Sequence, residues 1–293
     1  MTTHVGDRKG TSEAPVPRHH QLIVSLFGLY ARQHGGALAV ATIISLMQDI
    51  GVESTGTRSS ISRLKKRGVI DSVQVNGRSG YALAPSVIET FIEGDERIFH
   101  PRRAKEGDQW LLATFTVPES QRNIRHKIRS SLVRMGFGSV TPGLWIAPGH
   151  LRNSVLAYFE TRGLNEYLEF FLADHIGGED LHKNIASWWD LPALDALYSD
   201  FLDRNRGLLT SWTRREGSRN DLESDARAFA DYLVLITQWR RLPYLDPGLP
   251  INFLPENWNA LGAEHLFQEL HALLSPRAQR HADRAIDDNI VAN

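Results

Sequence analysis

The spacing of apolar residues changes along this chain, and that change limits the folds it can adopt. Residues 19–34 and 37–50 carry apolar side chains at helical spacing. Residues 54–67 predict a third helix, with Ser54 or Thr55 as its N-cap and Gly68 at its end. Two short alternating strands then flank an Asn-Gly turn in "VIDSVQVNGRSGYALA". This order of three helices and a hairpin predicts a winged helix-turn-helix.

The pattern is different beyond a charged connector near residue 105. Residues 106–176 predict strand, helix, strand, strand, helix and strand, which is the ferredoxin-like βαββαβ order. From residue 179 the strand signals vanish, and three helices are expected, with a Pro-rich loop between the last two. The expected fold is therefore α+β: an N-terminal winged helix-turn-helix, a central ferredoxin-like βαββαβ domain and a C-terminal helical domain.

The same pattern suggests the domain limits. We expect a disordered arm over residues 1–18, a winged-helix domain with its linking helix over 19–98, a ferredoxin-like domain over 106–176, a helical domain over 179–275 and a tail over 276–293. The first 18 residues lack the apolar stretch of a signal peptide, and no apolar run approaches the roughly 20 residues of a membrane helix. The chain has no cysteine, which excludes disulfides and thiol catalysis. We expect a cytoplasmic protein without a membrane partner.

Charge is distributed unevenly along the chain. The whole chain carries a net charge of −1, but residues 18–84 hold eight Lys and Arg against three Asp and Glu, a net +5. A basic module on an acidic body indicates an anionic partner, and nucleic acid is the commonest.

The helix expected over residues 54–67 has two distinct faces. Ile61 and Leu64, with Thr57 or Ser60, form an apolar stripe, and basic and hydroxyl side chains lie opposite. Such a face suits the major groove of duplex DNA. The predicted DNA contacts are Thr57, Arg58, Ser59, Ser62, Arg63, Lys65, Lys66 and Arg67, with Arg78 at the hairpin tip. A solvated basic face near a helix C-terminus is the alternative interpretation.

Four sequence segments, taken together, resemble those of a known protein family. The motifs "TRSSISRLKKRGVI", "GRSGYAL", "GFGSVTPGLWIAP" and "DPGLPINFLPENW" occur in an order that resembles the PaaX family of bacterial transcriptional repressors. The resemblance implies a winged-helix DNA-binding domain, a ferredoxin-like domain that helps to form a homodimer, and a helical C-terminal domain. It also implies an aryl-acyl-CoA effector, such as phenylacetyl-CoA, that releases the repressor from a palindromic operator.

An effector of this kind needs an apolar cleft and cations for its phosphates. The segment "QWRRLPY" offers Trp239, Arg240, Arg241 and Tyr244 as candidate effector-binding residues, although such residues also commonly lock a Pro-rich loop onto a core. A second basic helix carries Arg122, Arg125, Lys127, Arg129 and Arg134. It could be a solvated face, a second DNA-backbone contact or a phosphate site, and the sequence leaves these open.

A metal-dependent nuclease, or another nucleic-acid-processing protein built on the ferredoxin-like domain, is the rival hypothesis. The ferredoxin-like region also resembles that of a CRISPR-associated nuclease, whose chemistry needs a carboxylate at the end of the first strand. Residues 110–116 contain no Asp or Glu. The densest group of potential ligands is Asp174, His175, Asp180 and His182, whose spacing fits a surface loop better than a metal site. We therefore expect that this protein is not an enzyme and that it binds no metal and no cofactor.

Overall fold

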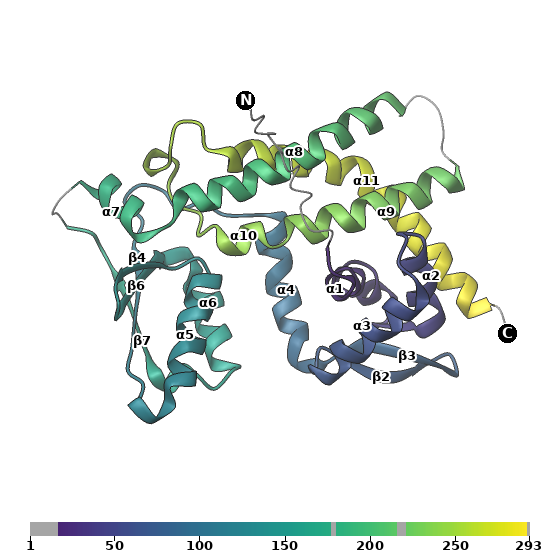
Figure 1. Ribbon diagram of the computed structural model, residues 1–293, viewed down its shortest axis with the longest axis horizontal. Coiled ribbons are helices and arrows are strands. Elements are labelled where there is room, and N and C mark those ends of the chain that lie inside the picture. Colours follow the sequence, from purple (N-terminus) through teal and green to yellow (C-terminus); the bar gives the residue numbers. More distant parts are fainter. Residues whose placement is uncertain (1–16, 177–179, 216–220, 292–293) are drawn as a thin grey trace, which may run out of the picture.

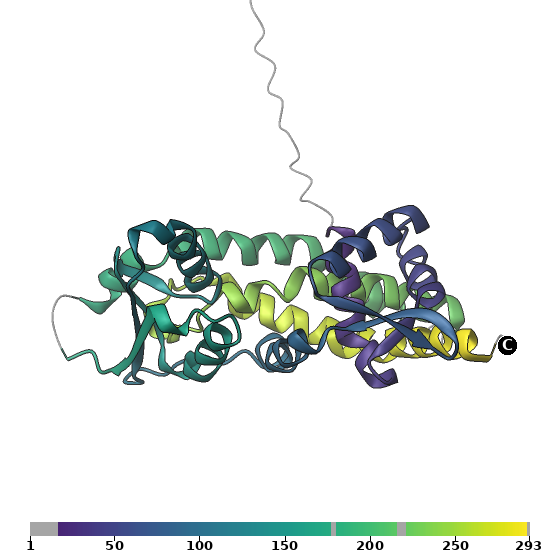
Figure 2. The same cartoon turned by 90° about the horizontal axis from the view of Figure 1, so that it is seen from below.

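The computed structural model describes residues 17–176, 180–215 and 221–291 of the chain. The fold mixes helices with two small antiparallel sheets (Figure 1). The four-stranded sheet and its helices form one lobe, and the N-terminal helices and the three-stranded sheet form another. Long C-terminal helices run across both lobes, as the view from below also shows (Figure 2). Most of the arm predicted over residues 1–18 lies outside the described residues.

The N-terminal elements follow in the predicted order of three helices and a hairpin. They are α1 (His19–Leu29), the 3-10 turn η1 (Ala31–His34), β1 (Ala37–Ala39), α2 (Val40–Gln48), α3 (Ser54–Lys66), β2 (Ile70–Val75) and β3 (Arg78–Leu83). The hairpin turns at Asn76 and Gly77, whose φ angles of 51° and 76° are the left-handed values that a two-residue turn of this type requires. The sheet order is β1-β3-β2.

Strand β1 departs from the expectation of a helix from residue 37 onward. Residues 37–39 pair with the far strand of the hairpin, with Leu38 opposite Tyr81, and the helix begins only at Val40. A three-residue strand has no detectable period, and its partner lies about 40 residues away in the chain.

The central lobe has the βαββαβ order predicted from the sequence. Its elements are β4 (Trp110–Phe115), α5 (Arg122–Arg134), β5 (Gly138–Thr141), β6 (Leu144–Pro148), α6 (Arg152–Glu160) and β7 (Leu168–Ala173). The strand order is β5-β6-β4-β7, all antiparallel. Helices α5 and α6 cover one face through a core that includes Ile128, Leu132, Val155 and Phe159. Helix α4 (Pro85–Phe99) follows the hairpin and leads toward this lobe.

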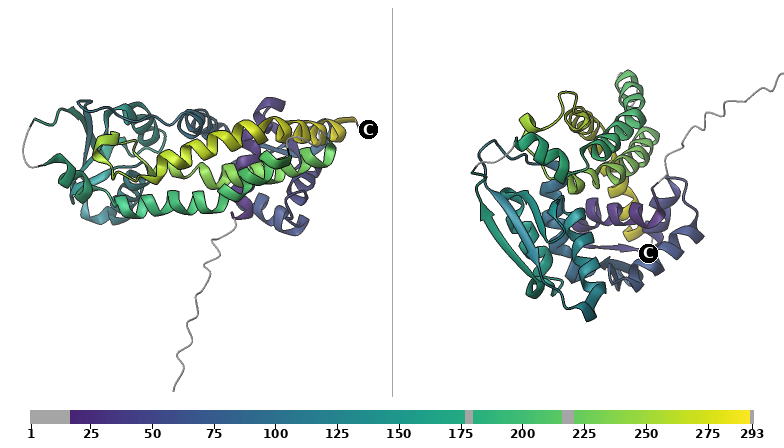
Figure 3. Two further views of the ribbon diagram at one scale, coloured as in Figure 1. Left: turned by 90° about the horizontal axis from the view of Figure 1, so that it is seen from above. Right: turned by 60° about the vertical axis from the view of Figure 1, so that its left-hand side comes forward.

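The C-terminal region contains α7 (Leu181–Trp188), α8 (Leu191–Arg215), α9 (Leu222–Trp239), α10 (Leu242–Leu245), the 3-10 turn η5 (Ile251–Phe253) and α11 (Asn259–Val291). Helices α8, α9 and α11 lie side by side (Figure 3). The first of the three expected helices is in fact two, because the chain becomes extended at Trp189 and Asp190 caps the next helix by accepting from the Ala193 amide at 3.1 Å.

Helix α11 continues through Pro276, so the expected boundary between residues 275 and 276 falls inside a helix. A proline there removes one backbone hydrogen bond. The loss is offset by packing, because Ala278, Ala282 and Ile286 are buried at successive four-residue intervals. The buried carboxylate of Asp225 on α9 also accepts hydrogen bonds from Arg280 and Arg284 at 2.7 and 2.8 Å.

The two ends of the chain share one hydrophobic core. Leu26 and Phe27 of α1 belong to the same buried cluster as Phe229 of α9 and Ile286 of α11. Polar contacts reinforce this packing, because His281 of α11 lies 2.8 Å from Asp49, and Thr237 of α9 bonds Ser25 of α1 at 2.8 Å. The N-terminal helices are therefore held directly against the long C-terminal helices.

We predict that Asp225→Asn lowers the free energy of unfolding by about 1–3 kcal/mol, because two guanidinium groups lose their buried anionic partner. Burial alone would raise the pKa of Asp225, but Arg280 and Arg284 hold that pKa below its ordinary value. The extra stability is therefore present above the unfolded pKa of about 3.9 and is lost as pH falls through the lower folded pKa. Urea titrations at neutral and acidic pH measure both effects.

The matched control is Asp203→Asn, which breaks an exposed pair with Arg206. Its effect should stay within about 0.5 kcal/mol. Equal losses in both variants, or a loss in Asp225→Asn that persists at acid pH, would contradict the assignment.

Candidate nucleic-acid interface and ligand cleft

Helix α3 presents one buried face and one exposed basic face. Ser60, Ile61 and Leu64 are at most 3% exposed and pack against the N-terminal core. Gly56 lets α3 approach α1 closely, because a Cβ there would come within 2.9 Å of the His19 ring. The side chains predicted to contact DNA that lie on the exposed face are Arg58, Ser59, Ser62, Arg63, Lys65, Lys66 and Arg67.

The structure contradicts the prediction that Thr57 contacts DNA. Its side chain is fully buried, and its hydroxyl donates to the Glu53 carbonyl at 3.2 Å. Ser60 and Ile61 follow Thr57 by three and four residues. All three side chains therefore lie on the same buried stripe of α3. Thr57 supports the helix from inside and does not reach its outer surface.

The cations on α3 have no carboxylate partners among the described residues. Within the described ranges, the Arg63 guanidinium bonds only the Ser60 hydroxyl, at 3.3 Å. Elsewhere the pattern differs: Arg32 pairs with Asp95, and Arg204 pairs with Asp200. Cations left without internal anions on one helix face are available to an external anion. Arg78 stands directly after the hairpin turn, opposite Val75, and is partly buried.

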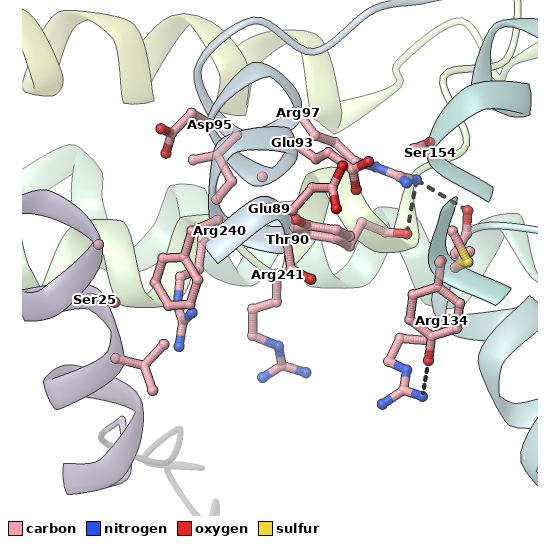
Figure 4. A pocket seen from close by; sticks show the side chains of 18 of the residues that line it. Ser25, Glu89, Thr90, Glu93, Asp95, Arg97, Arg134, Ser154, Arg240 and Arg241 are labelled. Carbon is pink, nitrogen blue, oxygen red and sulfur yellow. Dashed lines mark hydrogen bonds between the residues drawn. The ribbon is translucent and has the colours of Figure 1, made fainter. Parts of the chain in front are cut away.

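A cleft of about 560 Å³ lies between the two lobes (Figure 4). Its walls come from α1, α4, α5, α6, the end of α9 and α10, most of which are far apart in the sequence. Apolar side chains contribute much of the lining, among them Val24, Leu29, Phe91, Met135 and Ile236. The volume is that of a typical small-molecule site.

Charges are separated across this cleft. Arg134, Arg240 and Arg241 all point toward one edge in Figure 4, whereas Glu89 and Glu93 lie on the opposite side. Burial and the neighbouring Glu89 raise the pKa of Glu93, while Arg162 opposes this rise. The edge with the three arginines is therefore the part of the cleft suited to an anionic group.

Arg97 is a buried cation in the cleft wall. Its Nε donates to the Pro243 carbonyl at 2.8 Å, and its Nη2 donates to the carbonyls of Met135 at 3.1 Å and Tyr244 at 3.3 Å. Burial lowers the pKa of Arg97, but a guanidinium remains charged at neutral pH. No salt bridge to Arg97 is formed within the described part of the chain, so its charge adds to the attraction for an anion in the cleft.

The structure brings together three of the four predicted effector residues. Arg240, Arg241 and Tyr244 line the cleft. The prediction that Trp239 binds the effector is wrong, because its side chain is 0% exposed. Its Nε1 donates to the Ile98 carbonyl at 2.9 Å, and its ring stacks on Phe267 with ring centroids 4.6 Å apart. Adjacent residues on a helix point about 100° apart, so Trp239 enters the core while Arg240 faces the cleft.

Sequence reasoning missed most of the cleft. Arg97 and Glu93 belong to a helix predicted only as a linker, and Arg134 belongs to the second basic helix, whose role the sequence left open. Two of the other cations on that helix, Arg122 and Arg125, are paired with Glu119. The position of the Arg97 guanidinium could not be predicted, because its three carbonyl partners lie 38 to 147 residues away.

Among the residues that the structure describes, the candidate ligands do not form a metal site. Across the described ranges, no three His, Asp or Glu side chains come together as a metal ion would require. Asp180 instead caps α7 by accepting from the His182 amide at 3.0 Å, and residues 177–179 lie outside the described residues. In the described part of the chain no helix is both long and apolar enough to cross a membrane.

Comparison with known proteins gives consistent matches along the chain. Residues 18–87 match the family of PaaX-like proteins, residues 103–185 the PaaX protein central Cas2-like domain, and residues 189–284 the PaaX-like protein C-terminal domain. The transcriptional repressor PaaX of Escherichia coli (strain K12) is 24% identical over 260 residues, which cover 88% of this chain and 80% of the repressor. The uncharacterized protein Rv0674 from Mycobacterium tuberculosis has a similar fold, with a TM-score of 0.52, 19% identity and coverage of 88% of this chain and 97% of that one. With three adjoining matches to one family, this chain belongs to the PaaX family.

Proposed function

We propose that this protein is a cytoplasmic transcriptional repressor that binds a palindromic operator as a homodimer and is released by an aryl-acyl-CoA. The observation that carries the proposal is the exposed face of α3, whose cations have no carboxylate partners among the described residues. The similarity to a transcriptional repressor supports the same conclusion.

The N-terminal elements support a winged helix-turn-helix. Helices α2 and α3 are joined by a short turn, and the hairpin of β2 and β3 follows directly, in the position of a wing. In this arrangement α3 is the recognition helix and enters the major groove. Within this proposal, Arg58 and Arg63 read base edges, while Arg78 contacts the DNA backbone beside the hairpin.

We expect DNase I footprinting on an operator to protect two symmetry-related half-sites. The central domain is the proposed dimer contact, and a two-fold dimer presents its two recognition helices to inverted repeats. An asymmetric footprint with one protected half would contradict the dimer. The same DNA should remain uncut with magnesium or manganese, and cleavage would show that the protein is a nuclease.

We expect Arg58→Ala and Arg63→Ala to weaken operator binding by about 1–3 kcal/mol for whichever side chain makes a bidentate base contact. Lys66→Ala and Arg78→Ala should weaken binding to operator and random DNA alike, because phosphate contacts carry no sequence information. Anisotropy titrations with both DNAs measure the difference. Thr57→Val is the control and should leave DNA affinity unchanged because Thr57 is buried. Equal losses on both DNAs for all four variants would show that α3 does not read bases.

The cleft between the lobes is the proposed effector site. A CoA thioester offers an aryl group for the apolar lining and phosphates for the edge that carries Arg134, Arg240 and Arg241. A ligand lowers operator affinity only as far as it prefers the DNA-free state. A ligand that binds the DNA-free state about 100-fold more tightly than the DNA-bound state weakens operator binding by about 2.7 kcal/mol.

We predict that phenylacetyl-CoA raises the melting temperature and lowers operator affinity, whereas free phenylacetate does neither. The free acid lacks the phosphates that the arginines would hold. In calorimetric titrations Arg241→Gln should weaken thioester binding roughly tenfold, since hydrogen bonds to charged groups contribute about 1.5–3 kcal/mol. Arg129→Gln, an exposed change outside the cleft lining, serves as the control. Release of DNA by the free acid while thioesters fail would contradict the effector class.

A further inference from the structure

An arginine belt connects α3 with the cleft. The name refers to Arg18, Arg63, Arg67, Arg134, Arg240 and Arg241. The first three belong to the N-terminal segment, Arg240 and Arg241 follow the end of α9, and Arg134 ends α5. Sequence positions therefore give no indication that these side chains form one surface.

Helix α1 links α3 to the end of α9, because the His19 ring lies against Gly56 of α3. Burial lowers the pKa of His20, and the charges of Arg67, Arg63, Arg18 and Arg240 lower it further. Four of the six arginines thus lie close enough to act on one ring. Arg240 also donates to the Gln21 carbonyl at 3.2 Å, which fixes its position beside α1.

The remaining two arginines extend the belt along the cleft mouth. Figure 4 shows Arg240, Arg241 and Arg134 pointing toward the same edge of the cleft. The Arg134 guanidinium is held by the Tyr158 hydroxyl at 3.0 Å, and the Arg241 side chain is exposed. The acidic residues of the cleft, Glu89, Glu93 and Asp95, lie away from that edge.

None of the six belt arginines pairs with a carboxylate among the described residues. Arginines elsewhere in the fold, such as Arg103 with Glu264 and Arg280 with Asp225, are paired at 2.5 and 2.7 Å. Guanidinium groups without carboxylate partners on a packed scaffold are available to the phosphates of a polyanion. The arginine belt begins at α3, the candidate recognition helix. The polyanion that reaches the rest of the belt is therefore the DNA that α3 binds.

We propose that Arg134 and Arg241, at the cleft mouth, contact phosphates of the same DNA duplex whose groove α3 enters. This inference rests on the proposed function, because it takes α3 as the DNA-binding helix. The DNA-binding surface then extends from the N-terminal lobe across the cleft mouth to the central lobe. An anionic ligand in the cleft and the DNA backbone use the same guanidinium groups.

The test is the salt dependence of operator binding, measured by anisotropy without effector for Arg134→Gln, Arg241→Gln and wild type. Each lost phosphate contact should flatten the slope of log K against log salt by about 0.9. The ratio of operator to random-DNA affinity should stay unchanged, because phosphates carry no sequence information. Circular dichroism confirms folding of each variant.

Arg129→Gln is the matched control, since it removes one exposed charge from the same helix as Arg134 but lies outside the cleft lining. Its slope should equal that of wild type. Wild-type slopes in both test variants, with operator preference intact, would overturn this inference and leave the proposed function standing. Equal flattening in Arg129→Gln would overturn it as well, by showing a general charge effect. A wild-type protein without operator preference would instead overturn the proposed function itself.

Discussion

The guanidinium of Arg97 joins three parts of the chain. It belongs to α4 and donates to a carbonyl at the end of α5 and to two carbonyls of residues 243 and 244. A buried cation keeps its place only while its hydrogen bonds are satisfied, so the three segments are held in one geometry. The same α4 follows the hairpin directly, and its side chains line the cleft. The cleft and the candidate wing are thus connected by one 15-residue helix.

The second constraint is the core shared by the two ends of the chain. Helices α1, α9 and α11 contribute to one buried cluster, and Arg240 at the end of α9 bonds the Gln21 carbonyl of α1. A ligand that attracts Arg240 therefore acts on a side chain that also supports the helix beneath α3. In the proposed function, a ligand changes DNA affinity only as far as its affinities for the DNA-bound and DNA-free states differ, however tightly it binds.

Elements with a strong local signal could be predicted from the sequence. The hairpin at Asn76 and Gly77, the helix over α3 and the βαββαβ order each depend on neighbouring residues and a clear period. Strand β1, the break at Trp189 and the passage of α11 through Pro276 could not be predicted. Each is accompanied by contacts with distant residues: Leu38 pairs with Tyr81, the Trp189 indole donates to the Gly136 carbonyl at 2.9 Å, and Asp225 pairs with Arg280.

The same distinction holds for the candidate sites. The sequence by itself determined which residues are cationic and that most of them share one face of α3, because helical geometry follows from local spacing. Helical spacing left open whether Thr57 or Ser60 completes the buried stripe of α3, and the folded core buries both, while Trp239 was turned inward by packing. The cleft and the arginine belt were decided entirely by the tertiary structure. Their residues come from up to six elements, most of them separated by long stretches of chain, and only the folded core sets the distances between them.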